Sequence, residues 1–491
     1  MPVVKKYYWL VLLILIYPFQ SWSQSSESGT PPATLSPDGD SSKPALSDTG
    51  YKRPSFVISE IIITGNRKTK PYIIERELPF KKGDSIYLPD LVAGFQRARE
   101  LLINTRLFND VIVSLKAFHG YQVDVSIEVR ERWYIFPIPY FRPVDRNFTA
   151  WADKNYSLSR VNYGIKFSHN NFTGRNDKLR LWLVTGYTRQ ITLNYDQPYA
   201  DKSLKHGFGV GLTYAALKEL NLSTVNNRQL FLNADSLAFA GKFLTESLNL
   251  SAVYFYRPAI RTRHSLRFSL NYNKIDSIVT AKSPYYFNDN KRQIIYPELN
   301  YSMEYQNVDY VPYVLRGFMG DVNFVRRGIN ADMNLSQLSG RFTLGIPMGN
   351  KYYLGLQGAG TIKLPLDQPY FNQRLFGYGD MYLRGLEQYV IDGVAGALAR
   401  STIRKQLFAF NIPSRLPTLQ TIPVKIYLKT YGDLGYSYNR SFKDNSLVNK
   451  MMYTGGFGVD IVTVYDLVLR FEYDFNQLGQ QGLFFHVRND F

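Results

Sequence analysis

The residue types that most often carry catalysis or metal binding are sparse and widely separated in this sequence. The chain has no cysteine, which excludes disulfides, thiolate metal sites and a cysteine nucleophile. No i, i+4 pair and no His-Glu-x-x-His motif occurs among the histidines His119, His169, His206, His264 and His486. We therefore expect no catalytic residue, no metal and no cofactor. A Ser or Asp contributed by distant strands stays open as an alternative, because it would leave no local motif.

One segment combines charged side chains with an unusual local composition. Residues 375–393 contain four glycines together with Arg384 and Asp392, and they connect two segments with a strand pattern, Tyr353–Lys363 and Ala399–Phe410. A connection of this length without structure of its own is usually functional. The guanidinium of Arg384 presents a fixed fork of donors that suits a bidentate anionic partner. We expect this loop to carry the function.

The segments around this loop are predicted to be β-strands with one apolar and one polar face. Leu467–Phe475 is apolar at every odd position and charged at most even positions, and Leu483–Phe491 alternates in the same way up to its aromatic terminus. A soluble sandwich would also alternate. Outer-membrane barrels add aromatic girdles, and aromatic residues make up 15% of this chain. The pattern predicts an antiparallel transmembrane barrel of about 16 strands.

The amino terminus is typical of an exported protein. Lys5 and Lys6, the apolar run 8–17, and the small residues Ser21 and Ser23 predict a signal peptide at residues 1–24. Residues 25–54 are rich in Ser, Pro, Gly and Asp and predict a disordered linker. The formal net charge is +18, but no basic helix or recognised motif collects these charges. We interpret them as lumen and loop charges near lipid phosphates and expect no nucleic-acid partner.

Residues 55–133 predict a small α+β domain with the order β-α-α-β-β. The expected elements are Phe56–Thr64, Pro71–Leu78, Pro89–Ile103, Phe108–Leu115 and Tyr121–Val129. This order resembles the polypeptide-transport-associated (POTRA) domain. The resemblance depends on Ile61–Thr69, Lys82-Gly83-Asp84, Leu107–Val111 and Glu128–Trp133. We expect a POTRA domain at residues 55–133 and a barrel at 134–491, with strands after Pro143.

The glycine-rich loop resembles that of the BamA/TamA superfamily of barrel-assembly and translocation proteins. Their signature is an Arg-Gly dipeptide, flanked by apolar or aromatic residues, on a loop folded back into the lumen. The resemblance implies a carboxylate partner on the lumen wall, in a strand that reads aromatic-x-Asp-x-Gly, and Tyr431–Gly435 matches it. Residues Thr454–Asp460 resemble the family's glycine-rich penultimate strand region. The implied site residues are Leu383, Arg384, Gly385 and Leu386 on the loop, and Asp433 and Gly435 on the wall.

Two features depart from the family pattern. Leu315-Arg316-Gly317-Phe318 matches the short motif more literally than Leu383–Leu386 does. We favour Arg384, because it lies on the long glycine-rich loop, and we place Arg316 at the start of a strand that runs through Phe324. The second departure is Thr402, where the family often has glutamate. A lumen clamp with two carboxylates is therefore in doubt.

The resemblance implies an outer-membrane protein, with its POTRA domain in the periplasm, that inserts or translocates other polypeptides. The implied partners are client polypeptides (nascent outer-membrane or exported proteins), outer-membrane lipid and periplasmic accessory proteins. A weak seam between the first and last barrel strands would offer an edge where a client strand can pair. This seam is predicted at Val161, Val487 and Phe491. Clients could also add to the POTRA edge strand at Val111, Val113 and Leu115.

Two other functions remain open at this point. The first is a secretion pore of the two-partner type, which would pass one dedicated protein through the lumen. The second is a surface or structural barrel that transports nothing.

Overall fold

The computed structural model describes most of the chain, in the ranges 55–143, 158–234, 242–287, 290–330, 332–379, 381–416, 419–440 and 447–488. The predicted signal peptide and linker lie outside the described residues, as does the predicted seam residue Phe491. None of the helices in these ranges is long and apolar enough to cross a membrane.

The amino-terminal domain is a four-stranded sheet with two helices. Its elements are β1 (Ser55–Thr64), α2 (Pro71–Glu75), β2 (Ser85–Tyr87), α3 (Leu88–Asn104), β3 (Phe108–His119) and β4 (Gln122–Glu131). The sheet order is β2-β1-β4-β3, and β1 and β4 are parallel. Apolar residues of α3, such as Leu91 and Leu102, pack with Val111 and Val125 of the sheet in one buried core. The prediction missed β2, because three residues are too few to show an alternating pattern.

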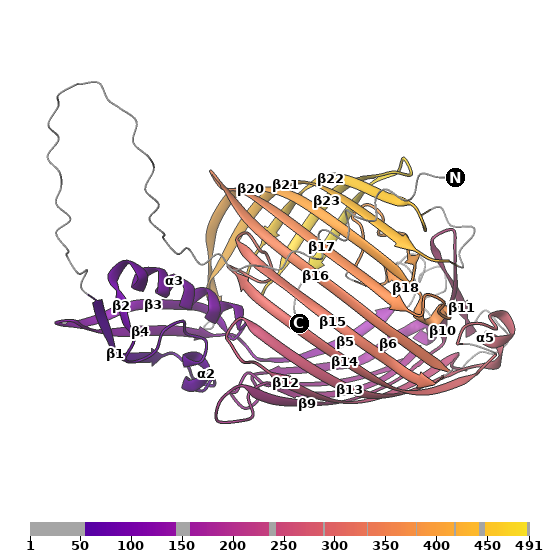
Figure 1. Cartoon of the computed structure of the whole chain (residues 1–491), viewed down its shortest axis with the longest axis horizontal. Helices are drawn as coiled ribbons and strands as arrows, with labels where there is room; N and C mark the ends of the chain where they lie inside the picture. The colour runs from indigo at the N-terminus through magenta and orange to yellow at the C-terminus, as the bar shows by residue number, and fades with distance from the viewer. Residues whose placement is uncertain are drawn as a thin grey trace, which may run out of the picture. The chain divides into compact units, whose positions relative to one another are not determined.

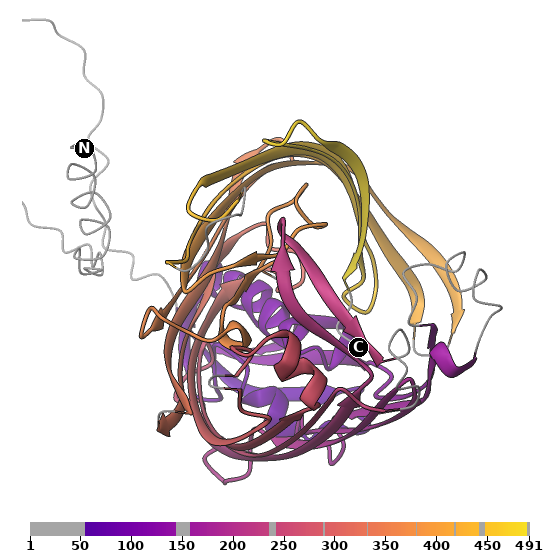
Figure 2. The same cartoon turned by 90° about the vertical axis from the view of Figure 1, so that its right-hand side faces the viewer.

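The rest of the described chain is dominated by a 16-stranded sheet, which we call the barrel sheet, and this confirms the predicted fold class. Every neighbouring pair is antiparallel, and the sheet curls around a central lumen (Figures 1 and 2). Its strands are β5 (Ile135–Pro143), β6 (Val161–Asn170), β7 (Lys178–Gly186), β8 (Thr188–Gln197), β9 (His206–Leu217), β12 (Thr245–Tyr256), β13 (Thr262–Ile275), β14 (Gln293–Val308), β15 (Gly317–Asn330), β16 (Met333–Gly349), β17 (Tyr352–Leu364), β20 (Ala395–Leu416), β21 (Leu419–Tyr438), β22 (Met451–Val462), β23 (Val468–Asn476) and β24 (Gln481–Arg488).

The two faces of the barrel sheet have the polarity expected for a membrane protein. On β23, Phe471 is 41% exposed, whereas its neighbour Glu472 is only 2% exposed. Phe475 and Asp474 repeat this contrast. Apolar side chains therefore cover the outside, while charged side chains face the lumen, as in outer-membrane barrels.

Short elements gather at the end of the barrel away from the amino-terminal domain (Figure 1). The hairpin β10 (Glu219–Val225) and β11 (Arg228–Asn233) extends over the opening (Figure 2). The backbone N–H of Val390 in the long loop donates to Asn227 O in the tip of this hairpin, at 2.8 Å. The other short elements are η2 (Leu158–Arg160), α5 (Ser277–Lys282), η4 (Tyr370–Asn372), β18 (Arg374–Phe376) and β19 (Ile391–Asp392).

The first barrel strand lies earlier in the chain than predicted. Strands were expected only after Pro143, but β5 spans Ile135–Pro143 and pairs with β6, from Ile135 opposite His169 to Pro143 opposite Val161. Val161 therefore belongs to the second strand and does not border the seam, which corrects that prediction. Proline is compatible with an edge strand, where one row of N–H groups has no partner.

Candidate functional site

The long loop between β17 and β20 folds back against the lumen wall and has structure of its own. Strands β18 and β19 form a small hairpin, in which Arg374 pairs with Asp392. An apolar cluster with Leu398 of β20 and Met452 of β22 contains the loop residues Leu375, Phe376, Leu383, Leu386, Tyr389 and Ile391. The expectation of an unstructured connection was therefore wrong. Its apolar side chains are buried against the wall and hold the loop in place.

Lys363, at the end of β17, fixes the base of this loop. Its ammonium group donates to Asn372 O at 2.8 Å, to Arg374 O at 2.6 Å and to Gly393 O at 3.3 Å. The two ends of the loop are thereby joined through one buried side chain. The sequence analysis did not identify Lys363, although a lysine at an inward-facing strand position beside the loop was a usable signal.

Arg384 of the loop lies in contact with Asp433 of β21 on the lumen wall. Arg384 Nε donates to Asp433 Oδ2 at 2.9 Å, and Arg384 Nη2 donates to Asp433 Oδ1. The backbone N–H of Arg384 donates to Oδ2 as well, at 3.1 Å. Arg384 is 8% exposed and Asp433 is 1% exposed. The pair has the bidentate geometry that a desolvated guanidinium and carboxylate require.

Neighbouring side chains complete the surroundings of Arg384. Its guanidinium carbon lies 3.9 Å from the centroid of the Tyr431 ring, within cation–π range. Arg384 Nη1 donates to Thr402 Oγ1 at 3.1 Å, so a neutral hydroxyl occupies the position where a second carboxylate was in doubt. Arg400 Nε lies 3.7 Å from Asp433 Oδ2 and adds a second cation to the same carboxylate.

Glycines make room for the loop motif at two places. A Cβ on Gly435 would lie 3.0 Å from both methyl groups of Leu383, so the missing side chain forms the recess that Leu383 fills. Gly385 has φ +79°, and a Cβ there would lie 3.0 Å from Asp474 Cβ. Asn476 Nδ2 donates to Gly385 O at 2.8 Å, which fixes the turn against β23.

Gly385→Ala is expected to lower the free energy of unfolding by about 1–2 kcal/mol, because an L side chain is strained at this φ. The matched control is Gly379→Ala on the same loop, since Gly379 has an ordinary φ and open space around its Cβ position. The stability of both variants is measured as the midpoint temperature at which heating changes their mobility on a gel. Equal midpoint temperatures for the two variants would contradict the role assigned to the backbone conformation of Gly385.

A second buried ion cluster lies beside the Arg384 pair and was not found from the sequence. Lys429 Nζ contacts Asp460 Oδ1 at 2.5 Å and Glu472 Oε1 at 2.7 Å. Tyr313 OH donates to Asp460 Oδ2 at 2.9 Å. These residues tie β21, β22 and β23 together on the wall that receives the loop.

The amino-terminal domain is attached to the turns of the barrel by bidentate ion pairs. Arg257 Nη1 contacts Glu77 Oε1 at 2.5 Å, and its Nη2 contacts Oε2 at 2.8 Å. Arg132 holds Asp466 in the same way, at 2.9 and 3.1 Å. Burial disfavours ionisation of Asp466, but hydrogen bonds and charge from Arg132 outweigh burial and lower its pKa below the ordinary value. This pair therefore persists at neutral pH, and its contribution is lost only as the pH falls through the lowered pKa.

The alternative motif arginine has a different role. Arg316 directly precedes β15, and its Nη2 donates to Glu100 Oε1 on helix α3. Asn104 of the same helix accepts a hydrogen bond from Val311 N at 3.0 Å. The structure thus places Arg384 on the lumen loop and Arg316 at the attachment of the amino-terminal domain.

The two edges of the barrel sheet are unlike each other. Within the described ranges, no backbone pairing joins β5 to β24. Tyr134 O accepts from Asn170 N at 2.8 Å, so the backbone N–H and C=O groups of even-numbered residues along β5 face β6. The backbone groups of odd-numbered residues, which include Pro137 and Pro139, face the open side of the sheet. Gln480 O accepts from Asn476 N at 3.0 Å, so the odd-numbered amides of β24 face the open side too. Proline lacks an N–H. The β5 edge is therefore short of donors, whereas the β24 edge has its full set.

Changing Pro137 and Pro139 to alanine is expected to increase pairing between β5 and β24, by about fivefold for each restored donor. The rate of disulfide formation between Phe141→Cys and Leu483→Cys measures this pairing. Pro297→Ala on β14, away from the edges, is the control and should leave the rate unchanged. An unchanged rate in the double proline variant would show that the missing donors do not keep the edges apart.

The predicted client edge of the amino-terminal domain is β3, the last strand in its sheet. The side chains of Val111, Val113 and Leu115 pack in or against the core. Arg99 Nε donates to Val111 O at 3.1 Å, so this carbonyl faces away from β4 and already has a donor. Strand addition here would start beyond Val111.

Comparison with known proteins identifies the amino-terminal domain. The POTRA family model, described as a surface antigen variable number repeat, matches residues 56–132. No curated protein sequence matches the chain significantly.

Several solved structures are similar to most of the chain. BamA from Haemophilus ducreyi lacking POTRA domains 1–3 matches at 15% identity and a TM-score of 0.47, over 88% of this chain and 84% of that chain. CdiB from Acinetobacter baumannii matches at 13% and 0.47, over 88% and 74%. CdiB from Escherichia coli matches at 12% and 0.44, over 92% of both chains. The family match and the coordinates together confirm the expected architecture of one POTRA domain followed by a 16-stranded sheet.

Proposed function

We propose that this chain, with a POTRA domain at residues 56–132 and a 16-stranded barrel sheet behind it, is an outer-membrane protein of the BamA/TamA type that inserts other polypeptides into the membrane. The POTRA domain would lie in the periplasm. Its partners would be client polypeptides and the surrounding lipid, with periplasmic accessory proteins as further candidates.

The observation that carries this proposal is the edge of β24, which has no paired strand within the described residues. Unsatisfied backbone groups cost several kcal/mol each in hydrocarbon, so membrane barrels normally close. Here the apolar outer face continues to the last strand, where Leu483, Phe485 and Val487 are exposed. Their amides face the open side and could pair with an incoming strand by β-augmentation. The donor-poor β5 is a weaker template, so we assign the client to β24.

The loop at Arg384 suits the same function. It is fixed to the wall formed by β21 and β22, close to the β24 side of the barrel, through Asp433 and the apolar cluster. A loop held in this way blocks the lumen and keeps the wall beside the edge rigid while client strands add from outside.

Reconstitution into liposomes tests the proposal. The purified full-length chain should accelerate the insertion of a urea-denatured outer-membrane barrel, compared with empty liposomes. No acceleration would contradict it. Protection of a soluble exported protein inside the vesicles, without insertion, would instead support the two-partner type of secretion pore.

A further inference from the structure

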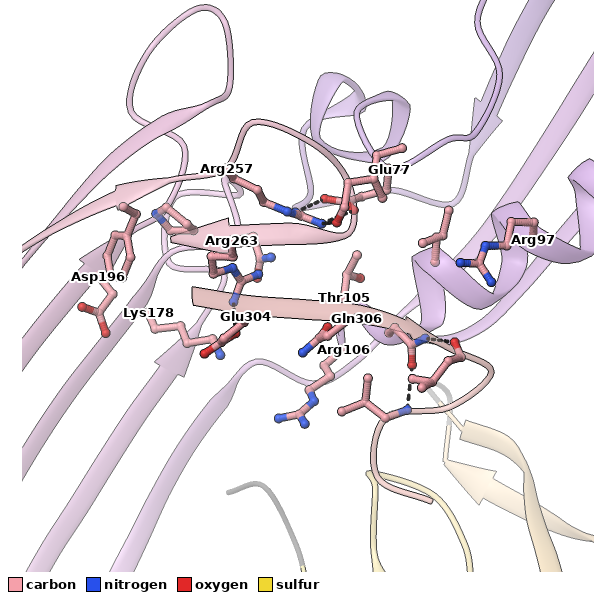
Figure 3. Close-up of a pocket in the computed structure, with 18 residues that line it drawn as sticks. Glu77, Arg97, Thr105, Arg106, Lys178, Asp196, Arg257, Arg263, Glu304 and Gln306 are labelled. Atoms are coloured by element: carbon pink, nitrogen blue, oxygen red, sulfur yellow. Dashed lines mark hydrogen bonds and ion pairs between the residues drawn. The ribbon is translucent and has the colours of Figure 1, made fainter. Parts of the chain in front are cut away.

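Two neighbouring cavities lie at the mouth of the barrel, beside the end of helix α3. Their volumes are about 360 and 370 Å³, and both are lined by Thr105, Arg106, Asn176 and Lys178. Figure 3 shows the side chains of Lys178 and Arg263 directed toward Glu304, while the Arg106 side chain extends away from these three. The second cavity adds Arg180 and the aromatic rings of Trp133, Phe136 and Trp182. We call the two together the mouth cavity.

The basic side chains that line the mouth cavity outnumber its acidic side chains. Glu77 is already held by Arg257, and Asp466 by Arg132. The remaining acids of the lining are Asp196 and Glu304, and Glu304 lies 4.0 Å from Arg263. Arg97 contacts Glu100, and Arg106 contacts Asp466. In the part of the chain that the structure describes, the side chains of Lys178 and Arg180 make no hydrogen bond or ion pair. Two cations on one strand thus line the cavity without a hydrogen bond or an ion pair, and Asp196 is the acid that attracts Lys178.

The backbone at Arg106 provides an independent observation. Arg106 follows the last turn of α3 with φ +63°, in the left-handed region that L side chains rarely adopt. Glycine or asparagine is the usual residue at such a helix end. The conformation of this turn therefore does not explain why residue 106 is an arginine. Its side chain reaches the mouth cavity, where Nε lies 3.8 Å from Asp466 Oδ2.

We propose that the mouth cavity binds carboxylate groups on an acidic segment of a client polypeptide that reaches the mouth of the barrel from the POTRA side. Guanidinium groups match carboxylates in a planar, bidentate geometry. The aromatic rings would pack against the apolar parts of the same segment. Lys178, Arg180 and Trp182 lie on the opposite face of β7 from Leu183, which is exposed toward lipid, so lipid headgroups around the barrel do not face the cavity. This inference rests on the proposed function, and it adds that the recognised segment of the client is negatively charged.

Peptide binding to the full-length chain in a neutral detergent tests the inference. A fluorescent 12-residue peptide of alternating Asp and Ser is the probe, and its Lys-Ser counterpart is the charge control. The test variant combines Arg106→Asn, Lys178→Gln and Arg180→Gln. A matched control for lost charge is Arg326→Gln near the far end of β15, where Arg326 bonds to Asn334. We expect the test variant to bind the acidic peptide at least about tenfold more weakly, with no change for Arg326→Gln.

Arg106→Asn alone separates a binding role from a structural one. Because asparagine tolerates the left-handed turn, this variant should be at least as heat-stable as the wild type and still bind the acidic peptide more weakly. Equal binding of acidic and basic peptides, or unchanged binding in the test variant, would overturn the inference. Displacement of the acidic peptide by inorganic phosphate at submillimolar concentration would also overturn it, by making the cavity a phosphate site. If the peptide binds as expected but liposome insertion fails, the proposed function falls and the anion site stands.

Discussion

Arg384→Ala is expected to lower the free energy of unfolding by about 3–5 kcal/mol, the typical result of removing one partner of a buried ion pair. Asp433 would keep the backbone N–H of residue 384 and the more distant cation of Arg400, 3.7 Å away, but it would lose both guanidinium hydrogen bonds. The hydrogen bond to Thr402 and the contact with the Tyr431 ring would be lost as well. The loop would then be held mainly by Lys363 and its apolar cluster. We expect it to leave the wall for part of the time.

Two measurements report on this loss. The temperature of heat-modified gel mobility should fall, and single-channel conductance in planar bilayers should rise as the lumen opens. Arg316→Ala is the matched control, because it removes an arginine from a second Arg-Gly sequence that contacts Glu100 instead of the loop. It should weaken attachment of the POTRA domain and leave conductance near the wild-type value. Open channels in Arg316→Ala with closed channels in Arg384→Ala would contradict the assignment.

A disulfide between the two edges is expected to abolish client insertion reversibly. Phe141 on β5 and Leu483 on β24 both carry exposed side chains, and the antiparallel order places both toward the end of the barrel away from the POTRA domain. Cysteines at these positions would close the sheet covalently and deny the client an edge. Liposome insertion should fall to the rate of empty liposomes under oxidation and recover after reduction.

The control for this variant is a disulfide that joins strands already paired. Phe324 on β15 and Leu338 on β16 lie opposite each other, and both are exposed. Cysteines there should not affect insertion in either redox state. Full insertion by the oxidised Phe141–Leu483 variant would rule out an edge mechanism and favour passage through the lumen.

The wall and loop residues could be named from the sequence because each stands in a motif that resembles one of the BamA/TamA superfamily. The expected number of strands came from the length of the chain after Pro143, at about 20 residues for each strand with its connection, and the 16-stranded sheet confirms it. The first strand was missed because Pro137 and Pro139 look like interruptions, and only the pairing of β5 with β6 shows that their missing N–H groups face an open edge.

Contacts between distant segments could not be predicted from local motifs or from strand alternation. Lys363 reaches three carbonyl groups of the loop, and Arg316 reaches Glu100 on a helix more than two hundred positions earlier in the chain. The local pattern around each residue does not name its partner, because only the folded chain brings that partner close. The sequence shows that the chain as a whole is basic, but it does not show that basic side chains gather at the mouth cavity.

The proposed function requires that clients pair with the edge of β24. Photo-crosslinking during client assembly tests it most directly, with benzoylphenylalanine placed in turn at Phe485 on β24, Phe141 on β5 and Phe324 in the middle of the sheet. The proposed function predicts a strong crosslink between the client and Phe485, a weaker one at Phe141 and none at Phe324. A client that crosslinks equally at all three positions, or at none of them while insertion proceeds, would contradict it.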